Sequence, residues 1–235
     1  MTTAQLKTIG IIGGLSPEST AQYYIGLNHK VAALTNGAHT AKILLSSVDF
    51  ELFVTLKNKG DWQTQGDLLV AEAVRLEQAG ADFIILATNT MHKMADQIEG
   101  AISIPFLHLA DATAQRIAQD GIGRIGLLGT RYTMELDFYK DRLRDKGIES
   151  LVPDGGGRQI IQDIIYDELV KSVVSAQSRQ ASREIIAALV KKGAQGIILG
   201  CTELTMLIEQ SDSAVPLYDT TRIHVEQAAR FSLEN

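Results

Sequence analysis

Cysteine is almost absent from this chain of 235 residues, which contains Cys201 and no other. A single thiol cannot form an internal disulfide, and chains without disulfides are typical of reducing compartments. Residues 1–8 lack the basic-then-apolar build of a signal peptide, and no apolar run approaches the length of a membrane-spanning helix. We therefore expect a cytoplasmic protein that has no membrane partner.

Positive charge is also in the minority, with 22 Lys and Arg against 28 Asp and Glu, for a formal net charge of −6. This balance argues against a general nucleic-acid surface, although a local basic pocket for a small anion would fit it. No cluster of His, Cys and Asp has metal-ligand spacing, so we expect no metal. The glycine turn Gly10–Gly14 matches neither the dinucleotide fingerprint nor a P-loop and instead suits close backbone approach to a small carboxylate.

The chain does contain a regular alternation of short apolar runs and amphipathic segments. This alternation predicts an α/β fold with doubly wound parallel sheets. The predicted strands cover the runs 9–14, 41–49, 83–86, 125–129, 150–153 and 197–200.

Cys201 follows the apolar run 197–200 and precedes an amphipathic segment, so we expect a buried strand to deliver the thiol to the start of a helix. A lone cysteine is most often a small buried hydrophobe. However, ligands of α/β proteins bind at the carboxyl ends of strands, where the N–H groups of a helix terminus favour a thiolate. Cys201 is therefore a candidate for acid–base chemistry.

Three landmarks recur at nearly one spacing, which indicates an internal repeat. Thr88 and Cys201 end similar apolar runs 113 residues apart, Ile9 and Ile125 begin similar strands 116 residues apart, and Pro105 and Pro216 open similar segments 111 residues apart. We expect two pseudo-symmetric α/β domains that enclose a central cleft. Residues 1–104 plus 216–235 form the first, carrying Thr88, and residues 105–215 form the second, carrying Cys201.

The sequence also predicts the local structure of two segments in the second half. We expect Thr130 to Thr133 to be a loop, followed by a helix over 134–146. The three glycines of Asp154–Arg158 suit a mobile flap over the cleft or a plain flexible loop, and the spacing predicts one helix over 159–174.

The motifs of the chain resemble those of the aspartate/glutamate racemase family, along nearly its whole length. The matching stretches are Ile-Gly-Ile-Ile-Gly-Gly-Leu-Ser-Pro-Glu-Ser-Thr at 9–20, Ser-Val-Asp-Phe at 47–50, Asn-Thr-Met-His at 89–92, Gly-Thr-Arg-Tyr-Thr-Met at 129–134 and Gly-Cys-Thr-Glu-Leu at 200–204. The resemblance implies a cofactor-independent enzyme, commonly a homodimer, in which two cysteines on opposite faces of the substrate Cα exchange its proton. Glu203 after the Cys-Thr pair is similar to the aspartate racemase branch.

The chain departs from this pattern at the first cysteine, where it has Ala87 and Thr88. A cysteine, with a reference pKa of about 8.5, can act as base or acid, whereas a threonine hydroxyl is a far poorer base. We expect Cys201 to be the main base and Thr88 a weaker partner, with slow turnover or with unequal kinetics for the two enantiomers. Loss of function is the alternative interpretation of Thr88.

The predicted substrate-binding residues surround these two positions. Backbone N–H groups near Asn89, Thr90 and Thr202 are expected to hold the α-carboxylate, and a guanidinium is expected to bind a side-chain carboxylate. The full predicted set is Leu15, Ser16, Asn89, Thr90, Thr130, Arg131, Arg158 and Thr202. Asn89 could instead cap a helix, Arg131 and Arg158 could be surface charges, and Glu203 and His92 are expected to be structural.

Three functions remain open at this stage. The first is a racemase of a small acidic amino acid, aspartate or glutamate, with Cys201 opposed by Thr88. The second is a single-cysteine decarboxylase or isomerase of small dicarboxylic acids, which needs a proton donor on one face only. The third is a catalytically weak protein that binds an amino acid as a regulator.

Overall fold

The computed structural model describes residues 6–234 and divides into two compact units. Unit 1 takes its described residues from Met1–Leu109 and His224–Asn235, and unit 2 is Ala110–Ile223. Residues 1–5 and 235, which belong to the predicted first domain and in part to the segment inspected for a signal peptide, lie outside the description. The division differs from the predicted ranges at 105–109, which join unit 1, and at 216–223, which join unit 2.

Strand pairing explains both differences. Phe106 makes a parallel bridge with Ile84, so the segment after residue 104 continues the first sheet. The strand β7 (Leu217–Asp219) pairs in parallel with β6 (Ile197–Gly200), so residues 217–219 belong to the second sheet.

Unit 1 is built on a parallel sheet with the order β2-β1-β3. The strands are β1 (Ile9–Gly13), β2 (Ile43–Ser47) and β3 (Phe83–Leu86). The helical segments of this unit are α1 (Pro17–Leu34), α2 (Phe50–Asn58), α3 (Trp62–Gln78), the 3-10 helix η1 (Thr90–Met94), α4 (Ala95–Glu99) and the end of α11 (Thr220–Leu233).

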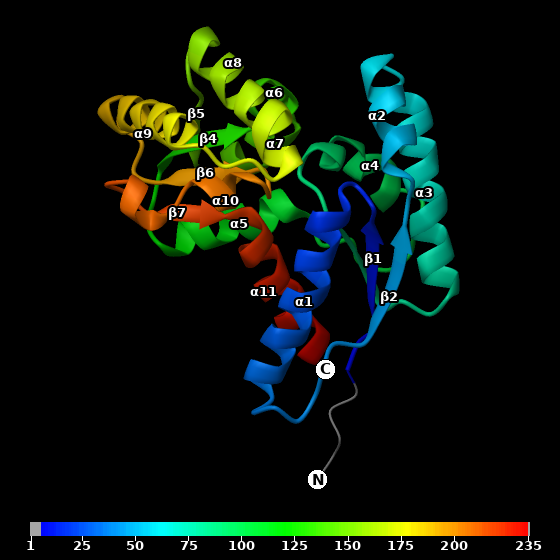
Figure 1. The fold of residues 1–235 in the computed structure, drawn as a ribbon. Helices are drawn as coiled ribbons and strands as arrows, with labels where there is room; N and C mark the ends of the chain where they lie inside the picture. The colour runs from blue at the N-terminus through cyan, green and yellow to red at the C-terminus, as the bar shows by residue number, and fades with distance from the viewer. Residues whose placement is uncertain (1–5, 235) are drawn as a thin grey trace. The chain divides into compact units, whose positions relative to one another are not determined.

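Alternate residues of the strands face opposite layers of helices, as a doubly wound sheet requires. Ile9 and Ile11 belong to a cluster with side chains of α1 and α11, including Tyr23 and Val225. Ile12 belongs to a second cluster, with side chains of α3, η1 and α4. In Figure 1, α1 and α11 accordingly lie on one side of this sheet and α3 on the other.

Unit 2 has a parallel sheet with the order β5-β4-β6-β7. Its other strands are β4 (Arg124–Gly129) and β5 (Glu149–Leu151). The helical segments are α5 (Leu109–Gln119), α6 (Arg131–Glu135), α7 (Asp137–Arg144), α8 (Gly155–Asp163), the π-helix η2 (Ile164–Glu168), the 3-10 helix η3 (Leu169–Lys171), α9 (Ala176–Lys191), α10 (Leu204–Leu207) and the 3-10 helix η4 (Gln210–Asp212).

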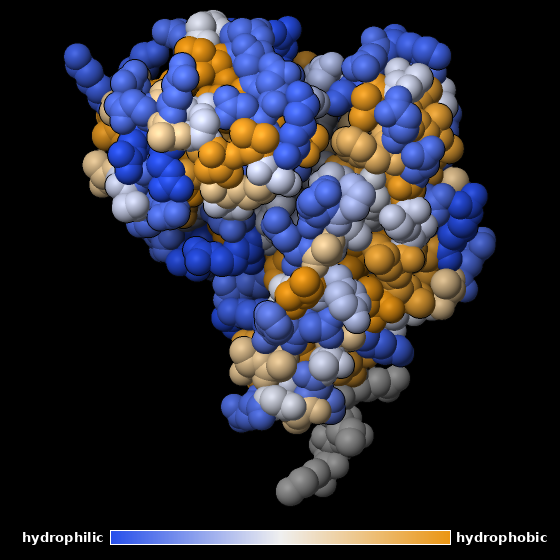
Figure 2. All heavy atoms as spheres, viewed as in Figure 1, coloured by the Kyte–Doolittle hydropathy of each residue, from blue (hydrophilic) through white to orange (hydrophobic). Residues whose placement is uncertain are grey.

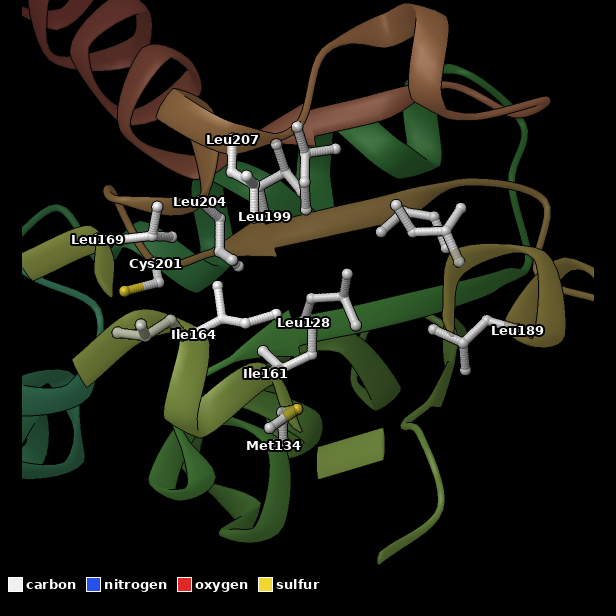
Figure 3. Packing of buried hydrophobic residues seen from close by; sticks show 14 of the residues in the cluster. Leu128, Met134, Ile161, Ile164, Leu169, Leu189, Leu199, Cys201, Leu204 and Leu207 are labelled. Atoms are coloured by element: carbon white, nitrogen blue, oxygen red, sulfur yellow. The ribbon is translucent and has the colours of Figure 1, made fainter. Parts of the chain in front are cut away.

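One large apolar cluster covers a face of this second sheet (Figure 3). Ile197, Leu199 and Cys201 point into it from β6 and the residue that follows, together with Ile161 and Ile164 of α8 and η2. The two-residue period of a strand explains why Cys201 shares the face of Ile197 and Leu199.

Strand register confirms the internal repeat. In unit 1, Ile12 pairs with Leu86, and in unit 2, Leu128 pairs with Leu199. Thr88 and Cys201 follow Leu86 and Leu199 by two residues each, so they occupy equivalent positions after equivalent strands. The bridge of Ile84 to Phe106 likewise corresponds to the pairing of Ile197 with Leu217.

Three expectations for unit 2 are wrong. Residues 131–133 form helix α6 rather than a loop, because the Thr130 side chain accepts a hydrogen bond from the Thr133 N–H and caps the helix. The glycine-rich segment is neither flap nor loop, because Asp154 caps α8 in the same way and the glycines form its first turn. The helix expected over 159–174 is split among α8, η2 and η3, and ends at Ser172 with φ of 59°.

The surface mixes hydrophilic and hydrophobic residues on both units in the view of Figure 2. Its large exposed hydrophobic side chains include Tyr24, Ile25, Leu45 and Leu52 of unit 1 and Ile160, Val173 and Val174 of unit 2. Among residues 6–234, none of the helices combines the length and the apolar character that crossing a membrane takes.

Candidate active site

The turn after β1 forms one part of the site in unit 1. Ser16 is buried and caps α1 by accepting a hydrogen bond from Ser19 N–H. Gly14 has φ of 86°, and a Cβ there would lie 2.3 Å from the carbonyl oxygen of Val48, so only glycine fits. Its N–H donates to Thr20 Oγ1 at 2.8 Å. The turn is therefore rigid where Leu15 and Ser16 meet the strand ends.

The segment after β3 lies at the same edge of the sheet. Ala87 is held from both sides, because its N–H donates to the Ile12 carbonyl at 2.9 Å and its carbonyl accepts from Ser19 Oγ at 2.9 Å. Thr88 is half-buried, whereas Asn89 and Thr90 are buried. Asn89 occupies the cap position of η1, but its side chain makes no capping hydrogen bond, so capping does not account for it.

Cys201 carries the corresponding position in unit 2. Its side chain is 8% exposed, and Figure 3 shows it at the end of β6, on the side of Ile164 and Leu169. The thiol donates to Glu203 Oε2 at 2.9 Å. Cys201 thus differs from a cysteine with only apolar neighbours, because a carboxylate accepts a hydrogen bond from its thiol.

The helix after Cys201 is short. It is the four-residue α10, which begins at Leu204, and Glu203 stands at its cap position without a capping side-chain bond. Glu203 was expected to be structural, and its carboxylate contacts the thiol. Thr202 is buried, and its carbonyl accepts from Thr205 Oγ1 at 2.7 Å, which fixes the turn.

Tyr166, on the π-helix η2, lies near the thiol and was not among the predicted site residues. Burial raises the pKa of its phenol, and the negative charges that Cys201, Tyr132 and Glu203 can carry raise it further. Tyr166 is therefore a hydroxyl donor beside the thiol. No sequence pattern identifies it, because the π-helix that presents it has no local signature.

The remaining predicted residues of unit 2 follow β4, whose last residue Gly129 pairs with Gly200 of β6. Thr130 thus lies at the same strand edge as Cys201. Arg131 donates from its guanidinium to Gln159 Oε1 and from its backbone N–H to Gln162 Oε1.

Whereas the guanidinium of Arg131 contacts a neutral amide, Arg158 forms an ion pair. Its Nε lies 2.9 Å from Glu135 Oε1 in an ion pair, and its Nη1 donates to the Pro153 carbonyl at 2.8 Å. An anionic ligand would have to compete with Glu135 for Arg158, whereas Arg131 contacts neutral amides.

The predicted residues thus fall into two sets, one on the segments that follow the strands of each unit. The first set is Leu15, Ser16, Thr88, Asn89 and Thr90, and the second is Thr130, Arg131, Arg158, Cys201 and Thr202. Within the described chain, no group of three or more His, Cys, Asp or Glu side chains is arranged to hold a metal ion.

Comparison with known proteins places this arrangement in a family. The model of the family "Asp/Glu/Hydantoin racemase" matches residues 12–228. A crystal structure from Yersinia pestis, described as a candidate Asp/Glu racemase, is 51% identical with a TM-score of 0.93 and covers 97% of this chain and 100% of that one.

Two further relatives are described more specifically. A structure from Pyrococcus horikoshii, described as an aspartate racemase homologue, is 32% identical with a TM-score of 0.84, over 97% of this chain and 100% of that one. The broad-specificity amino-acid racemase RacX of Bacillus subtilis is 26% identical over 91% of this chain and 92% of its own length.

Proposed function

The chain belongs to the Asp/Glu/hydantoin racemase family of amino-acid racemases, and we propose that it racemises aspartate or glutamate without a cofactor, using Cys201 as the main base and Thr88 as the opposing acid. The observation that carries the proposal is the equivalent placement of these two residues after β3 and β6. Racemisation needs a proton acceptor on one face of Cα and a donor on the other. Two related strand ends, each with one such group, supply both.

Glu203 prepares Cys201 for this role. The thiol has to lose its proton before the sulfur can accept the α-proton, and the carboxylate 2.9 Å away receives it. The sulfur then removes the α-hydrogen, and the Thr88 hydroxyl delivers a proton to the opposite face. Glu203 then releases to solvent the proton that it took from the thiol, and the Thr88 hydroxyl is restored by a proton from solvent. The enzyme returns to its starting state, and the amino acid leaves with inverted configuration.

Groups around these two residues bind the carboxylates of the substrate. Backbone N–H groups of Asn89, Thr90 and Thr202 bind the α-carboxylate, where negative charge grows as the proton leaves. Arg131 binds the side-chain carboxylate, because its present partner Gln159 is neutral and can be displaced without separating an ion pair. Arg158 holds Glu135 and serves as the second cation of this region.

A decarboxylase or isomerase of small dicarboxylic acids is the second candidate, and the presence of one thiol favours it. Such an enzyme would protonate a carbanion from the Cys201 side alone. A weak amino-acid-binding regulator is the third candidate and would perform neither reaction. We also propose that the protein is cytoplasmic and homodimeric. Light scattering after size-exclusion chromatography would test whether it is a dimer.

The deciding experiment follows the α-proton by NMR in D₂O, with chiral analysis, for the L and D forms of aspartate and glutamate. Exchange with inversion is expected from the native protein and none from Cys201→Ala. Full activity of Cys201→Ala would exclude Cys201 as the base. Release of CO₂ from a malonate-type acid without α-proton exchange would favour the decarboxylase, and ligand-dependent thermal stabilisation with neither reaction would favour the regulator.

A further inference from the structure

Unit 1 contains three buried histidines close to the Thr88 segment, namely His92, His108 and His224. The rings of His92 and His108 pack with centroids 4.6 Å apart. His92 makes hydrogen bonds through both ring nitrogens: Nδ1 lies 2.7 Å from the Thr88 carbonyl oxygen, and Nε2 lies 3.2 Å from the Leu109 backbone nitrogen.

The chemistry of these two partners fixes the protonation of His92. A carbonyl oxygen only accepts, so Nδ1 carries the proton and donates to Thr88. The backbone N–H of Leu109 only donates, so Nε2 offers its lone pair. His92 is thus the neutral Nδ1–H tautomer, because an imidazolium would point a second N–H at the N–H of Leu109.

The bond to His92 completes the restraint of the Thr88 backbone. The Thr88 N–H donates to the Leu86 carbonyl at 2.9 Å, which fixes the peptide group before the Thr88 Cα. The His92 bond fixes the peptide group after it. With both flanking peptide planes held, the direction of the Thr88 Cα–Cβ bond is set, and the reach of its hydroxyl with it.

Unit 2 restrains its equivalent residue without a histidine. The Cys201 carbonyl accepts a backbone hydrogen bond from Leu204 N–H at 3.1 Å. The side chain of His92, four residues after Thr88, therefore restrains Thr88, whereas a backbone turn restrains Cys201.

We propose that His92 is a positioning residue that aims the Thr88 hydroxyl at the substrate, a role that rests on the proposed racemase function. Misplacement of a reacting group by about 1 Å can cost roughly 100-fold in rate. Loss of the Nδ1 donor should therefore slow the proton transfer that Thr88 performs and leave the transfer by Cys201 nearly unchanged.

Three variants separate the two bonds from general destabilisation. In His92→Asn the amide nitrogen replaces Nδ1 and keeps the donor to Thr88. In His92→Gln the amide oxygen replaces Nε2 and keeps the acceptor for Leu109, but the donor to Thr88 is lost. His224→Gln is the matched control, because His224 is also buried and its ring centroid lies 6.0 Å from that of His92, but its ring nitrogens contact Tyr23 OH and the Leu107 carbonyl rather than Thr88.

The measurement is the ratio of inversion to deuterium exchange without inversion, for the enantiomer whose α-proton Cys201 removes. His92→Gln should lower this ratio by about tenfold or more, His92→Asn should restore most of it, and His224→Gln should leave it unchanged. An unchanged ratio in folded His92→Gln, or an equal fall in His224→Gln, would overturn the proposal.

A second readout does not depend on activity. Nitrogen-15 NMR of the imidazole should show a protonated Nδ1 and an unprotonated Nε2 for His92. The opposite tautomer, or an imidazolium at neutral pH, would refute the positioning bond even if every His92 variant failed to fold. A native protein that shows the expected tautomer but no α-proton exchange would instead refute the racemase function, and the catalytic role of His92 with it.

Discussion

At the scale of single residues, the contact between Cys201 and Glu203 makes the strongest prediction. Glu203→Gln removes the carboxylate that takes the thiol proton, so kcat/KM at neutral pH should fall by about 100-fold. The loss should shrink at high pH, where solvent hydroxide deprotonates the thiol. Kinetics of α-proton exchange across pH would measure both effects.

Glu149→Gln provides the control for this change. Glu149 lies in the same unit and pairs with Arg124 at an exposed position, so the substitution alters the net charge equally without touching the thiol. Equal activity of Glu203→Gln and the native protein would show that the thiol loses its proton by another route.

Thr88 makes the second prediction at this scale. Thr88→Cys replaces a poor acid–base group by a thiol at the position equivalent to Cys201, so inversion should become faster by about tenfold or more. Thr88→Val, which keeps the shape and removes the hydroxyl, should lose inversion. Unchanged or lower activity in a Thr88→Cys protein that melts like the native one would count against Thr88 as the opposing acid.

The sequence revealed the pair but not its surroundings. Thr88 and Cys201 could be found because a strand end has a local signature and the repeat shows it twice. The contact of Glu203 with the thiol and the approach of Tyr166 could not be found in this way. Both depend on where a short turn and a π-helix direct side chains, and neither geometry has a signature in residue order.

At the scale of elements, the first turn of α8 is helical although its three glycines predict a loop, and substitutions there test which contacts the glycines make. A Cβ added at Gly155 would meet open space, so Gly155→Ala should raise the free energy of unfolding by about 0.5–1 kcal/mol. A Cβ at Gly157 would lie 2.9 Å from Pro153 Cβ, so Gly157→Ala should gain less or destabilise. Urea denaturation of the two variants would measure the difference, and equal effects would contradict the packing argument.

The same turn shows which part of the fold the sequence predicts poorly. The predicted strand segments overlap six of the seven strands that residues 6–234 form. The three glycines favour a loop by propensity, but one capping aspartate and burial of Gly157 and Ile161 favour the helix. Tertiary packing favours the helix over the loop here, and the strength of that packing cannot be read from the order of residues alone.

At the scale of the whole molecule, His224 links folding to pH. Complete burial lowers the pKa of His224 from 6.5 to about 4. The hydrogen bond to the Leu107 carbonyl raises this pKa, but burial has the larger effect. In the unfolded chain His224 therefore becomes protonated below pH 6.5, whereas in the folded protein it stays neutral until the pH falls to about 4. Stability from this source is complete above pH 6.5 and is lost as the pH falls toward 4, by about 3 kcal/mol in all.

Replacing the histidine tests this linkage. His224→Gln cannot titrate, so its free energy of unfolding should depend less steeply on pH between 6.5 and 4 than that of the native protein. Denaturant titrations at several pH values in this window would measure the two slopes. Parallel slopes would show that His224 is protonated in the folded protein as readily as in the unfolded chain.

The route of the chain through the two units also has a consequence for its synthesis on the ribosome. Residues 110–223 leave the ribosome as an uninterrupted segment, and all four strands of the second sheet lie within it. The apolar layer against Ile9 and Phe83, in contrast, requires Val225, Ala228 and Ala229, which are translated only after the whole of unit 2. Of the two units, the one whose translation begins first is thus the last to complete its core, because until α11 has been made its side chains are missing from the layer against Ile9 and Phe83.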